Sequence, residues 1–303
     1  RVVLREVEDH MEPGALLVSN TSSLSITAMQ EVLDRPADFC GMHFFNPVHR
    51  MPLIEIVRGR HSGDRAIASV VALARRLDKT PVIVNDGPGF LVNRILAPYL
   101  NEAGWLLGEG GAIDAIDRVL LDFGMPMGPF RLLDEVGFDV ARHAGATMQD
   151  AFGERMQSPP ALDALPATQL LGRKGGLGFY RYEKDREAGV NDAIYGKLGS
   201  SVPGSRTGLD AAAVRDRTVL IMVNEAARLL EDGIAASAGD VDLAMITGTG
   251  FPPFRGGLLR WADSLGIDTV LARLERLAAS TGSRFQPAPL IRRLASEARG
   301  FHD

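Results

Sequence analysis

The sequence predicts an α/β domain followed by an all-helical region. Over residues 1–86, short apolar and β-branched runs alternate with runs of helical period. Residues 91–150 contain runs of helical period separated by glycines, and no convincing strand. Within the helical region, a segment of about a hundred residues occurs twice. The alternation predicts an open, mostly parallel sheet, and the duplication predicts two related helical domains after it.

The composition is that of an ordinary globular protein. Of the 303 residues, 46% are hydrophobic and 23% are charged, and the net charge of −5 argues against nucleic acid as a partner. No apolar run approaches the roughly 20 residues that a membrane-spanning helix needs. The single cysteine, Cys40, excludes an internal disulfide and fits a reducing compartment, so a cytoplasmic location is expected. Because Cys40 lies in an apolar run, it is expected to be a buried structural thiol.

The elements of the α/β domain follow from apolar periodicity and from the residues at their ends. The expected strands are the apolar runs at residues 15–20, 39–45, 52–59 and 80–86. The expected helices cover residues 1–10, 25–33 and 64–77. Ser25 is suited to cap the second of these helices, and the basic residues that close the third complement its dipole.

Two stretches of the helical region match each other. NEAGWLL at residues 101–107 matches NEAARLL at residues 224–230, and residues 116–139 match residues 241–268. The matched positions include Asp117 with Asp242 and Asp134 with Asp263. Two copies are too few for a solenoid. They are expected to pack on each other as a pseudo-dimer, a pseudo-twofold pair like two subunits.

Changes in composition mark the boundaries between these parts. Strand-like runs end at the turn DGPGF, residues 86–90. Residues 196–207 are rich in glycine, serine and proline, which suggests a linker between the helical copies. The expected domains are residues 1–86, 87–205 and 206–303.

Four polar residues at the ends of apolar runs form a candidate site, and they are Ser22, His43, Glu55 and Asn93. Such positions converge at the carboxyl edge of a parallel sheet, where α/β proteins bind small molecules. His43 ends one strand-like run, and Glu55 lies in the next, flanked by apolar neighbours on both sides. A buried carboxylate needs a partner, so the two are expected to pair as a general base and the group that orients it.

Simpler roles remain open for each of these residues. A histidine is most often a satisfied surface or core residue, and we expect this of the other five histidines. Ser22 belongs to a serine-rich run that is equally suited to helix capping. Asn93 suits a cap or an interdomain contact, and Glu55 suits a solvated edge strand. The sequence has no metal-ligand set at known spacing and no phosphate-binding P-loop, so no metal is expected.

Three segments resemble the signature sequences of the L-3-hydroxyacyl-CoA dehydrogenase family. They are SNTSSLSIT, GMHFFNPVHRMPLIEIVRG and VNDGPGFLVNRIL. The duplicated helical region, with GFPPFRGG in its second copy, resembles the dehydrogenase part of the multifunctional fatty-acid oxidation complex α-subunit. The resemblance spans essentially the whole chain. It implies a Rossmann-type domain, NAD as cofactor, and oxidation of (S)-3-hydroxyacyl-CoA to 3-ketoacyl-CoA.

The resemblance also implies a role for each site residue. His43 is then the catalytic base and Glu55 its carboxylate partner, with Ser22 and Asn93 as substrate-binding groups. Cofactor contacts are implied for Asn20, Ser22 and Asn46. The turn at residues 86–90 is a candidate hinge for closure of the helical region over the sheet, which excludes water. A thiolase subunit of the same complex is the implied protein partner.

One feature of the family is missing from the sequence. The family carries a G-x-G-x-x-G turn after its first strand, followed by an acidic residue that holds the ribose. The G-x-G runs at residues 108–110, 176–178 and 248–250 all lack the third glycine, and the chain does not begin with methionine. We therefore expect a partial Rossmann-type sheet, its second half only, within a carboxyl-terminal part of a longer protein that has lost most of its NAD contacts.

Two other functions remain open from sequence. The chain could serve as a structural and docking module of a β-oxidation assembly without its own catalysis. It could also belong to a related NAD-dependent dehydrogenase of hydroxy acids not linked to CoA. The HFFNPV and VNDGPGF segments favour the CoA enzyme over this last alternative.

Overall fold

The computed structural model describes residues 2–22, 24–184 and 186–303. The chain forms two compact units. The first contains residues 1–94, 226–264 and 300–303, and the second contains residues 95–225 and 265–299.

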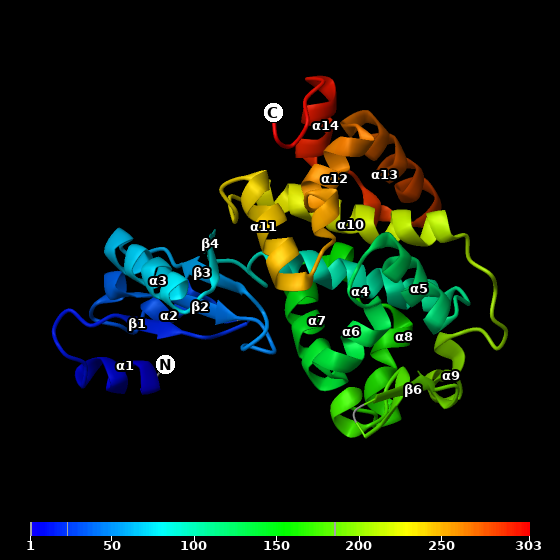
Figure 1. The fold of residues 1–303 in the computed structure, drawn as a ribbon, viewed down its shortest axis with the longest axis horizontal. Coiled ribbons are helices and arrows are strands. Elements are labelled where there is room, and N and C mark those ends of the chain that lie inside the picture. The colour runs from blue at the N-terminus through cyan, green and yellow to red at the C-terminus, as the bar shows by residue number, and fades with distance from the viewer. Residues whose placement is uncertain (1, 23, 185) are drawn as a thin grey trace. The chain divides into compact units, whose positions relative to one another are not determined.

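The first unit is built on a four-stranded sheet (Figure 1). Its strands, adjacent in chain order, are β1 (Leu17–Ser19), β2 (Phe39–Phe44), β3 (Leu53–Arg58) and β4 (Thr80–Asn85). Its helices are α1 (Val2–Asp9), α2 (Ile26–Gln30), α3 (Asp64–Arg76), α11 (Ala238–Thr249) and α12 (Leu258–Leu265). Each strand and each of the first three helices lies within the run predicted for it. Ser25 is the N-cap of α2, as predicted, and its hydroxyl accepts the N–H of Ala28 at 3.1 Å.

The directions of the strands differ from the prediction at the centre of the sheet. β1 pairs parallel with β2, and β3 parallel with β4, but β2 and β3 are antiparallel. Residues 45–52 are too few for the crossover of a dozen or more residues that parallel neighbours require. The expectation that all the polar site residues share the carboxyl edge of a parallel sheet is therefore wrong. Glu55 instead reaches the site from near the amino end of an antiparallel strand.

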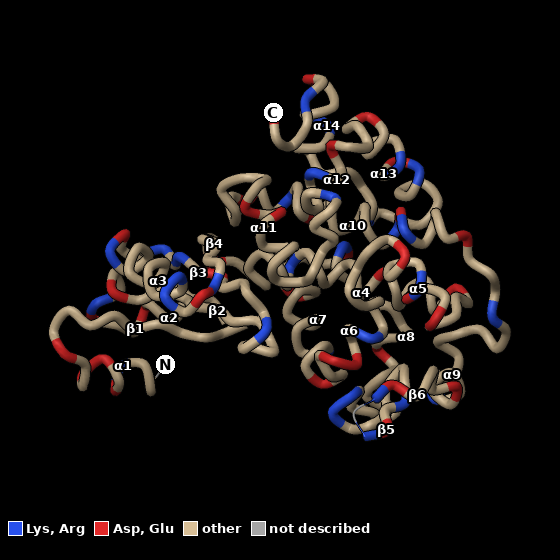
Figure 2. The backbone as a smooth tube through the Cα atoms, in the orientation of Figure 1, with Lys and Arg blue, Asp and Glu red and all other residues tan. Residues whose placement is uncertain are grey.

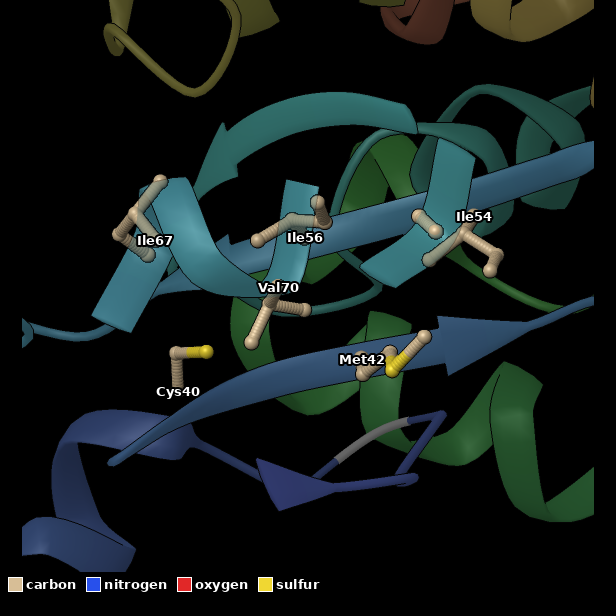
Figure 3. Close-up of a cluster of buried hydrophobic side chains, with 7 residues drawn as sticks. Cys40, Met42, Ile54, Ile56, Ile67 and Val70 are labelled. Carbon is tan, nitrogen blue, oxygen red and sulfur yellow. The ribbon is translucent and has the colours of Figure 1, made fainter. Parts of the chain in front are cut away.

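Alternation along β2 and β3 places one set of side chains against α3 and puts His43 and Glu55 on the opposite face. The apolar cluster between these strands and α3 includes Cys40, Met42, Ile54, Ile56, Ile67 and Val70 (Figure 3). Burial raises the pKa of the Cys40 thiol to about 11, which fits the predicted structural role. Gly41, His43 and Glu55 belong to the opposite face. There a Cβ on Gly41 would lie 2.7 Å from Val57 and 3.0 Å from Ile26, so the position needs glycine.

The second unit is helical apart from one hairpin (Figure 1). Its helices are α4 (Val92–Gly108), α5 (Ile113–Phe123), α6 (Pro129–Val136), α7 (Phe138–Phe152), α8 (Pro160–Asp163), α9 (Ala193–Leu198), α10 (Ala211–Glu231), α13 (Ile267–Thr281) and α14 (Pro289–Ser296). The first turn of α4 and the last turns of α10 belong to the first unit. The hairpin pairs β5 (Tyr180–Glu183) with β6 (Arg186–Val190). Acidic and basic residues are interspersed along the helices (Figure 2).

The duplication is visible in equivalent hydrogen bonds. In the second unit, the Asp117 carboxylate accepts the N–H of Phe130 at 2.9 Å, near the start of α6. In the first unit, the Asp242 carboxylate accepts the N–H of Leu259 at 2.6 Å, near the start of α12. Each aspartate thus caps the helix that follows its own. Two ion pairs of the second unit also reflect the duplication. Glu102 of the first copy pairs with Arg284 of the second, and the matching Glu225 of the second copy pairs with Arg155 of the first.

The two compact units do not coincide with the two copies. The second copy is divided, because α11 and α12 cluster with the sheet whereas α13 and α14 belong to the second unit. Gly248 of α11 explains the close approach to the sheet, since a Cβ there would lie 2.5 Å from the side chain of Leu53. The packing of the two copies as a pseudo-dimer stays a prediction. The predicted domain bounds remain predictions from the sequence, and they are residues 1–86, 87–205 and 206–303.

Among the described residues, none of the helices combines the length and the apolar character needed to cross a bilayer.

Candidate active site

The antiparallel pair at the centre of the sheet carries a histidine and a glutamate side by side. In the register of β2 and β3, His43 lies directly opposite Glu55. Opposite residues of such a pair point to the same face, and Nδ1 of His43 lies 2.8 Å from Oε2 of Glu55. His43 is 3% exposed and Glu55 is fully buried. The sheet therefore holds the imidazole against an enclosed carboxylate.

The second carboxylate oxygen of Glu55 fixes the start of α4. Oε1 accepts the backbone N–H groups of Leu91 at 3.2 Å and Val92 at 2.9 Å. These N–H groups lie at a helix N-terminus, where donors have no partner within the helix. Three donors thus stabilise the buried carboxylate. An ionised carboxylate only accepts hydrogen bonds, so His43 donates through Nδ1 and keeps Nε2 as its acceptor.

Ser22 lies beside Nε2, the ring nitrogen of His43 that does not contact Glu55. Its Oγ is 3.1 Å from Nε2 of His43, and the residue is exposed. Asn93, in the first turn of α4, donates through Nδ2 to the carbonyl oxygen of Ser22 at 3.5 Å. The structure thus brings together Ser22, His43, Glu55 and Asn93 within the first unit. Their roles in binding and catalysis stay predictions.

The residues expected on the cofactor side lie beside the same strands. Asn20 directly follows β1, and its Oδ1 accepts the N–H of Phe44 at 3.3 Å. This bond places Asn20 next to the end of β2. Asn46 lies two residues beyond that end, is exposed, and precedes Pro47 through a cis peptide bond.

Two aromatic rings that sequence reasoning did not select pack on the imidazole. The ring centroid of Phe45 lies 4.6 Å from that of His43, and the ring centroid of Phe90 lies 5.6 Å from it. Phe90 has a φ of 51°, a left-handed conformation that is uncommon outside glycine. Its place in the DGPGF turn, just before a helical run, was the available signal. The same signal points to the N–H groups of Leu91 and Val92, which have no acceptor within the helix and donate to Glu55.

A lysine that sequence reasoning missed holds the loop between β2 and β3. The Nζ of Lys79 donates to the carbonyl oxygens of Val48 at 2.5 Å and Met51 at 2.8 Å. These contacts fix the loop that contains Asn46. No motif in the sequence links Lys79 to that loop, because the contacts are to backbone oxygens.

A histidine whose tautomer is set by a buried glutamate is an arrangement suited to general acid–base chemistry. Residues 1–87 match the NAD-binding domain of 3-hydroxyacyl-CoA dehydrogenase. Residues 89–182 and 214–300 match the C-terminal domain of the same enzymes. The chain belongs to the 3-hydroxyacyl-CoA dehydrogenase family.

Individual relatives agree with this family. The chain is 44% identical over 308 residues to the fatty acid oxidation complex subunit alpha of Psychrobacter arcticus. That match covers 100% of this chain but 43% of the relative, so the chain spans less than half of its length.

Two solved structures are similar over nearly the whole chain. The 3-hydroxybutyryl-CoA dehydrogenase of Escherichia coli K12 is 28% identical with a TM-score of 0.83, covering 98% of this chain and 78% of its own. The dehydrogenase part of multifunctional enzyme 1 from C. elegans is 26% identical with a TM-score of 0.68. This match covers 95% of this chain and 66% of that one.

These matches correct one expectation about the fold. The sheet was expected to be the second half only of a Rossmann-type domain, because the sequence lacks the G-x-G-x-x-G turn. The NAD-binding domain of the family matches residues 1–87, which cover the whole four-stranded sheet and its first three helices. The absence of the glycine motif therefore did not justify assigning these residues to only half of the NAD-binding domain.

Proposed function

We propose that this chain carries the catalytic site for NAD-dependent oxidation of (S)-3-hydroxyacyl-CoA to 3-ketoacyl-CoA in fatty-acid oxidation. One observation supports the proposal most. His43 is held at Nδ1 by Glu55, 2.8 Å away, while Nε2 faces the exposed Ser22. This is the geometry of a general base whose tautomer is fixed by its partner.

In the proposed reaction, His43 moves the proton. Nε2 takes the proton of the substrate 3-hydroxyl as C3 becomes a carbonyl. The imidazolium that forms is stabilised by the Glu55 carboxylate, which its Nδ1–H already contacts. In the reverse direction, Nε2 returns the proton to the 3-oxygen.

Ser22 and Asn93 are proposed to orient the substrate. The Ser22 hydroxyl lies within hydrogen-bond distance of Nε2, so an oxygen bound at both groups is aligned for proton transfer. The Asn93 amide comes from the first turn of α4 and contacts the same loop. Its second N–H is suited to bind a carbonyl oxygen of the substrate.

The groups around His43 fit the nicotinamide end of NAD in their chemistry. Asn20 and Asn46 carry exposed side-chain amides close to the ends of β1 and β2. Amides complement the carboxamide of the nicotinamide, and we propose that these two residues and Ser22 contact it. When bound, NAD accepts the hydride that leaves C3.

We also propose that the full protein works with a partner subunit. The relative from Psychrobacter arcticus is described as the alpha subunit of a fatty acid oxidation complex. This description supports a protein partner, for which a thiolase subunit stays our expectation.

The proposal is tested by following NADH consumption with acetoacetyl-CoA, and with acetoacetate as the matched ketone that lacks CoA. We expect turnover with acetoacetyl-CoA and none above background with acetoacetate. Separate calorimetric titrations measure the binding of NADH and of acetoacetyl-CoA. Equal turnover of the two ketones would favour an enzyme of free hydroxy acids. A chain that binds neither NADH nor acetoacetyl-CoA would contradict the proposal and favour the docking module.

A further inference from the structure

The turn after β4 contacts the loop that carries Ser22. Asp86 directly follows β4, and its Oδ2 accepts the hydroxyl of Ser25 at 2.6 Å and the N–H of Thr27 at 2.8 Å. Ser25 in turn accepts the N–H of Ala28 through the same hydroxyl oxygen, at 3.1 Å. Asp86 therefore ends a short chain of hydrogen bonds that fixes the start of α2.

The loop between β1 and α2 is short and is fixed at both ends. Thr21 accepts the N–H of Leu24 through its Oγ1 at 2.9 Å, which closes a turn around Ser22. Ser25 lies three residues after Ser22 and is tied to Asp86. The Asn93 contact to Ser22, at 3.5 Å, is too long to hold the loop firmly by itself.

The other carboxylate oxygen of Asp86, Oδ1, carries a cost in the free energy of folding. Within the described part of the chain, its Oδ1 is buried and has no hydrogen-bond partner. Leaving a buried carboxylate oxygen without a donor costs free energy. Both contacts to the start of α2 go to Oδ2, so Asp86 holds Ser25 and Thr27 through one oxygen.

We propose that Asp86 is a positioning residue of the active site. By anchoring the loop at Ser25, it holds the hydroxyl of Ser22 at Nε2 of His43. The inference rests on the proposed function, in which Ser22 orients the substrate at the imidazole. It assigns to the DGPGF turn a role in aligning the site, in addition to its expected role as a hinge.

Asp86→Ala and Asp86→Asn distinguish a need for the hydrogen-bond acceptor of Asp86 from a need for its negative charge. Alanine removes both contacts to the start of α2, so kcat for acetoacetyl-CoA reduction should fall by about 10- to 100-fold, the scale of a small misplacement. Asparagine keeps a carbonyl oxygen that accepts from both Ser25 and Thr27, so most of the activity should return. Ser25→Ala breaks the same link from the other side and should reproduce the loss. An Asp86→Asn variant as slow as Asp86→Ala would overturn the proposal.

A background of Ser22→Ala tests whether Asp86 acts through Ser22. If it does, adding Asp86→Ala to Ser22→Ala lowers kcat no further, because the group being positioned is already absent. A further drop of the same size would mean that Asp86 acts by another route. Asp64→Ala is the matched control, since Asp64 is an exposed carboxylate of the same unit that pairs with Arg58, and it should leave kcat unchanged.

A spectroscopic measurement tests the role of Asp86 independently of the proposed enzymatic function. The ¹⁵N resonance of His43 Nε2, in the full chain labelled at histidine, reports the Ser22 contact without any turnover. Asp86→Ala, Ser25→Ala and Ser22→Ala should each move it in the same direction, and Asp64→Ala should not. If the wild-type chain shows no turnover, the proposed function fails while this measurement still decides the role of Asp86. A resonance that moves with Ser22→Ala alone would contradict that role.

Discussion

Replacing His43 by glutamine is expected to lower kcat for acetoacetyl-CoA reduction by about 10²–10⁴-fold, the usual scale for a lost general base. The amide of glutamine has no basic nitrogen, so nothing at this position takes or returns the proton. Its N–H groups remain able to donate to the Glu55 carboxylate, which His43 now contacts at 2.8 Å. Steady-state kinetics and thermal unfolding of the same preparations measure both effects.

The control for His43→Gln is His61→Gln. His61 is an exposed histidine just after β3 in the same unit, and its replacement should leave kcat unchanged. Turnover of His43→Gln within a few-fold of wild type would remove His43 from the mechanism. A large drop in the melting temperature that accompanies the loss of kcat would instead point to misfolding.

Glu55→Gln is expected to lower kcat by a similar factor, about 10²–10⁴-fold, although it barely changes the shape of the side chain. Glu55 accepts two backbone N–H groups through Oε1 and the imidazole N–H through Oε2. If the glutamine oxygen keeps the backbone donors, its NH₂ group faces the imidazole. His43 then turns to the tautomer that accepts at Nδ1 and carries its proton on Nε2, which cannot act as a base.

Two further variants separate the catalytic role of Glu55 from its structural one. Glu55→Ala leaves the N–H groups of Leu91 and Val92 without their acceptor. Each such buried group costs about 1–3 kcal/mol, so chemical denaturation should give a clear loss of stability. Glu12→Gln changes an exposed glutamate of the same unit, and it should alter neither kcat nor stability. Wild-type turnover in Glu55→Gln would mean that the pair does not set the tautomer.

The local elements, and the grouping of polar residues around His43, were readable from sequence because the signals are local. Apolar runs gave the strands, and Ser25 stands where a helix cap was expected. His43 and Glu55 were chosen because a polar group inside an apolar run needs a partner. The direction of β3 was missed because the argument rested on alternation of elements and ignored the short link before it.

Contacts to backbone atoms were beyond sequence reasoning. Lys79 binds carbonyl oxygens of a loop, and Glu55 binds N–H groups of α4, and these contacts leave no pattern of residue types. Asp86 was noticed only as part of a turn. Its hydrogen bonds to Ser25 and Thr27 join residues about sixty positions apart, and only the folded chain brings them together.

The repeat extends further than the sequence match indicated. In the second unit, the hydroxyl of Tyr180 donates to the Asp117 carboxylate at 2.9 Å. In the first unit, the ring of His302 lies 3.1 Å from Asp242, the equivalent aspartate. A histidine thus takes the place of a tyrosine at the end of the second copy. The sequence match stopped earlier because the two side chains differ in type although they contact equivalent carboxylates.

The tautomer of His43 tests the central claim most directly. Two-bond ¹H–¹⁵N correlation spectra of the histidine-labelled chain report which ring nitrogen carries the proton, and His43→Gln identifies the resonance. We expect a neutral ring with its proton on Nδ1, toward Glu55, and an unprotonated Nε2. In Glu55→Gln the proton should move to Nε2. A wild-type ring that carries its proton on Nε2 would contradict the claim that Glu55 prepares His43 to act as the base.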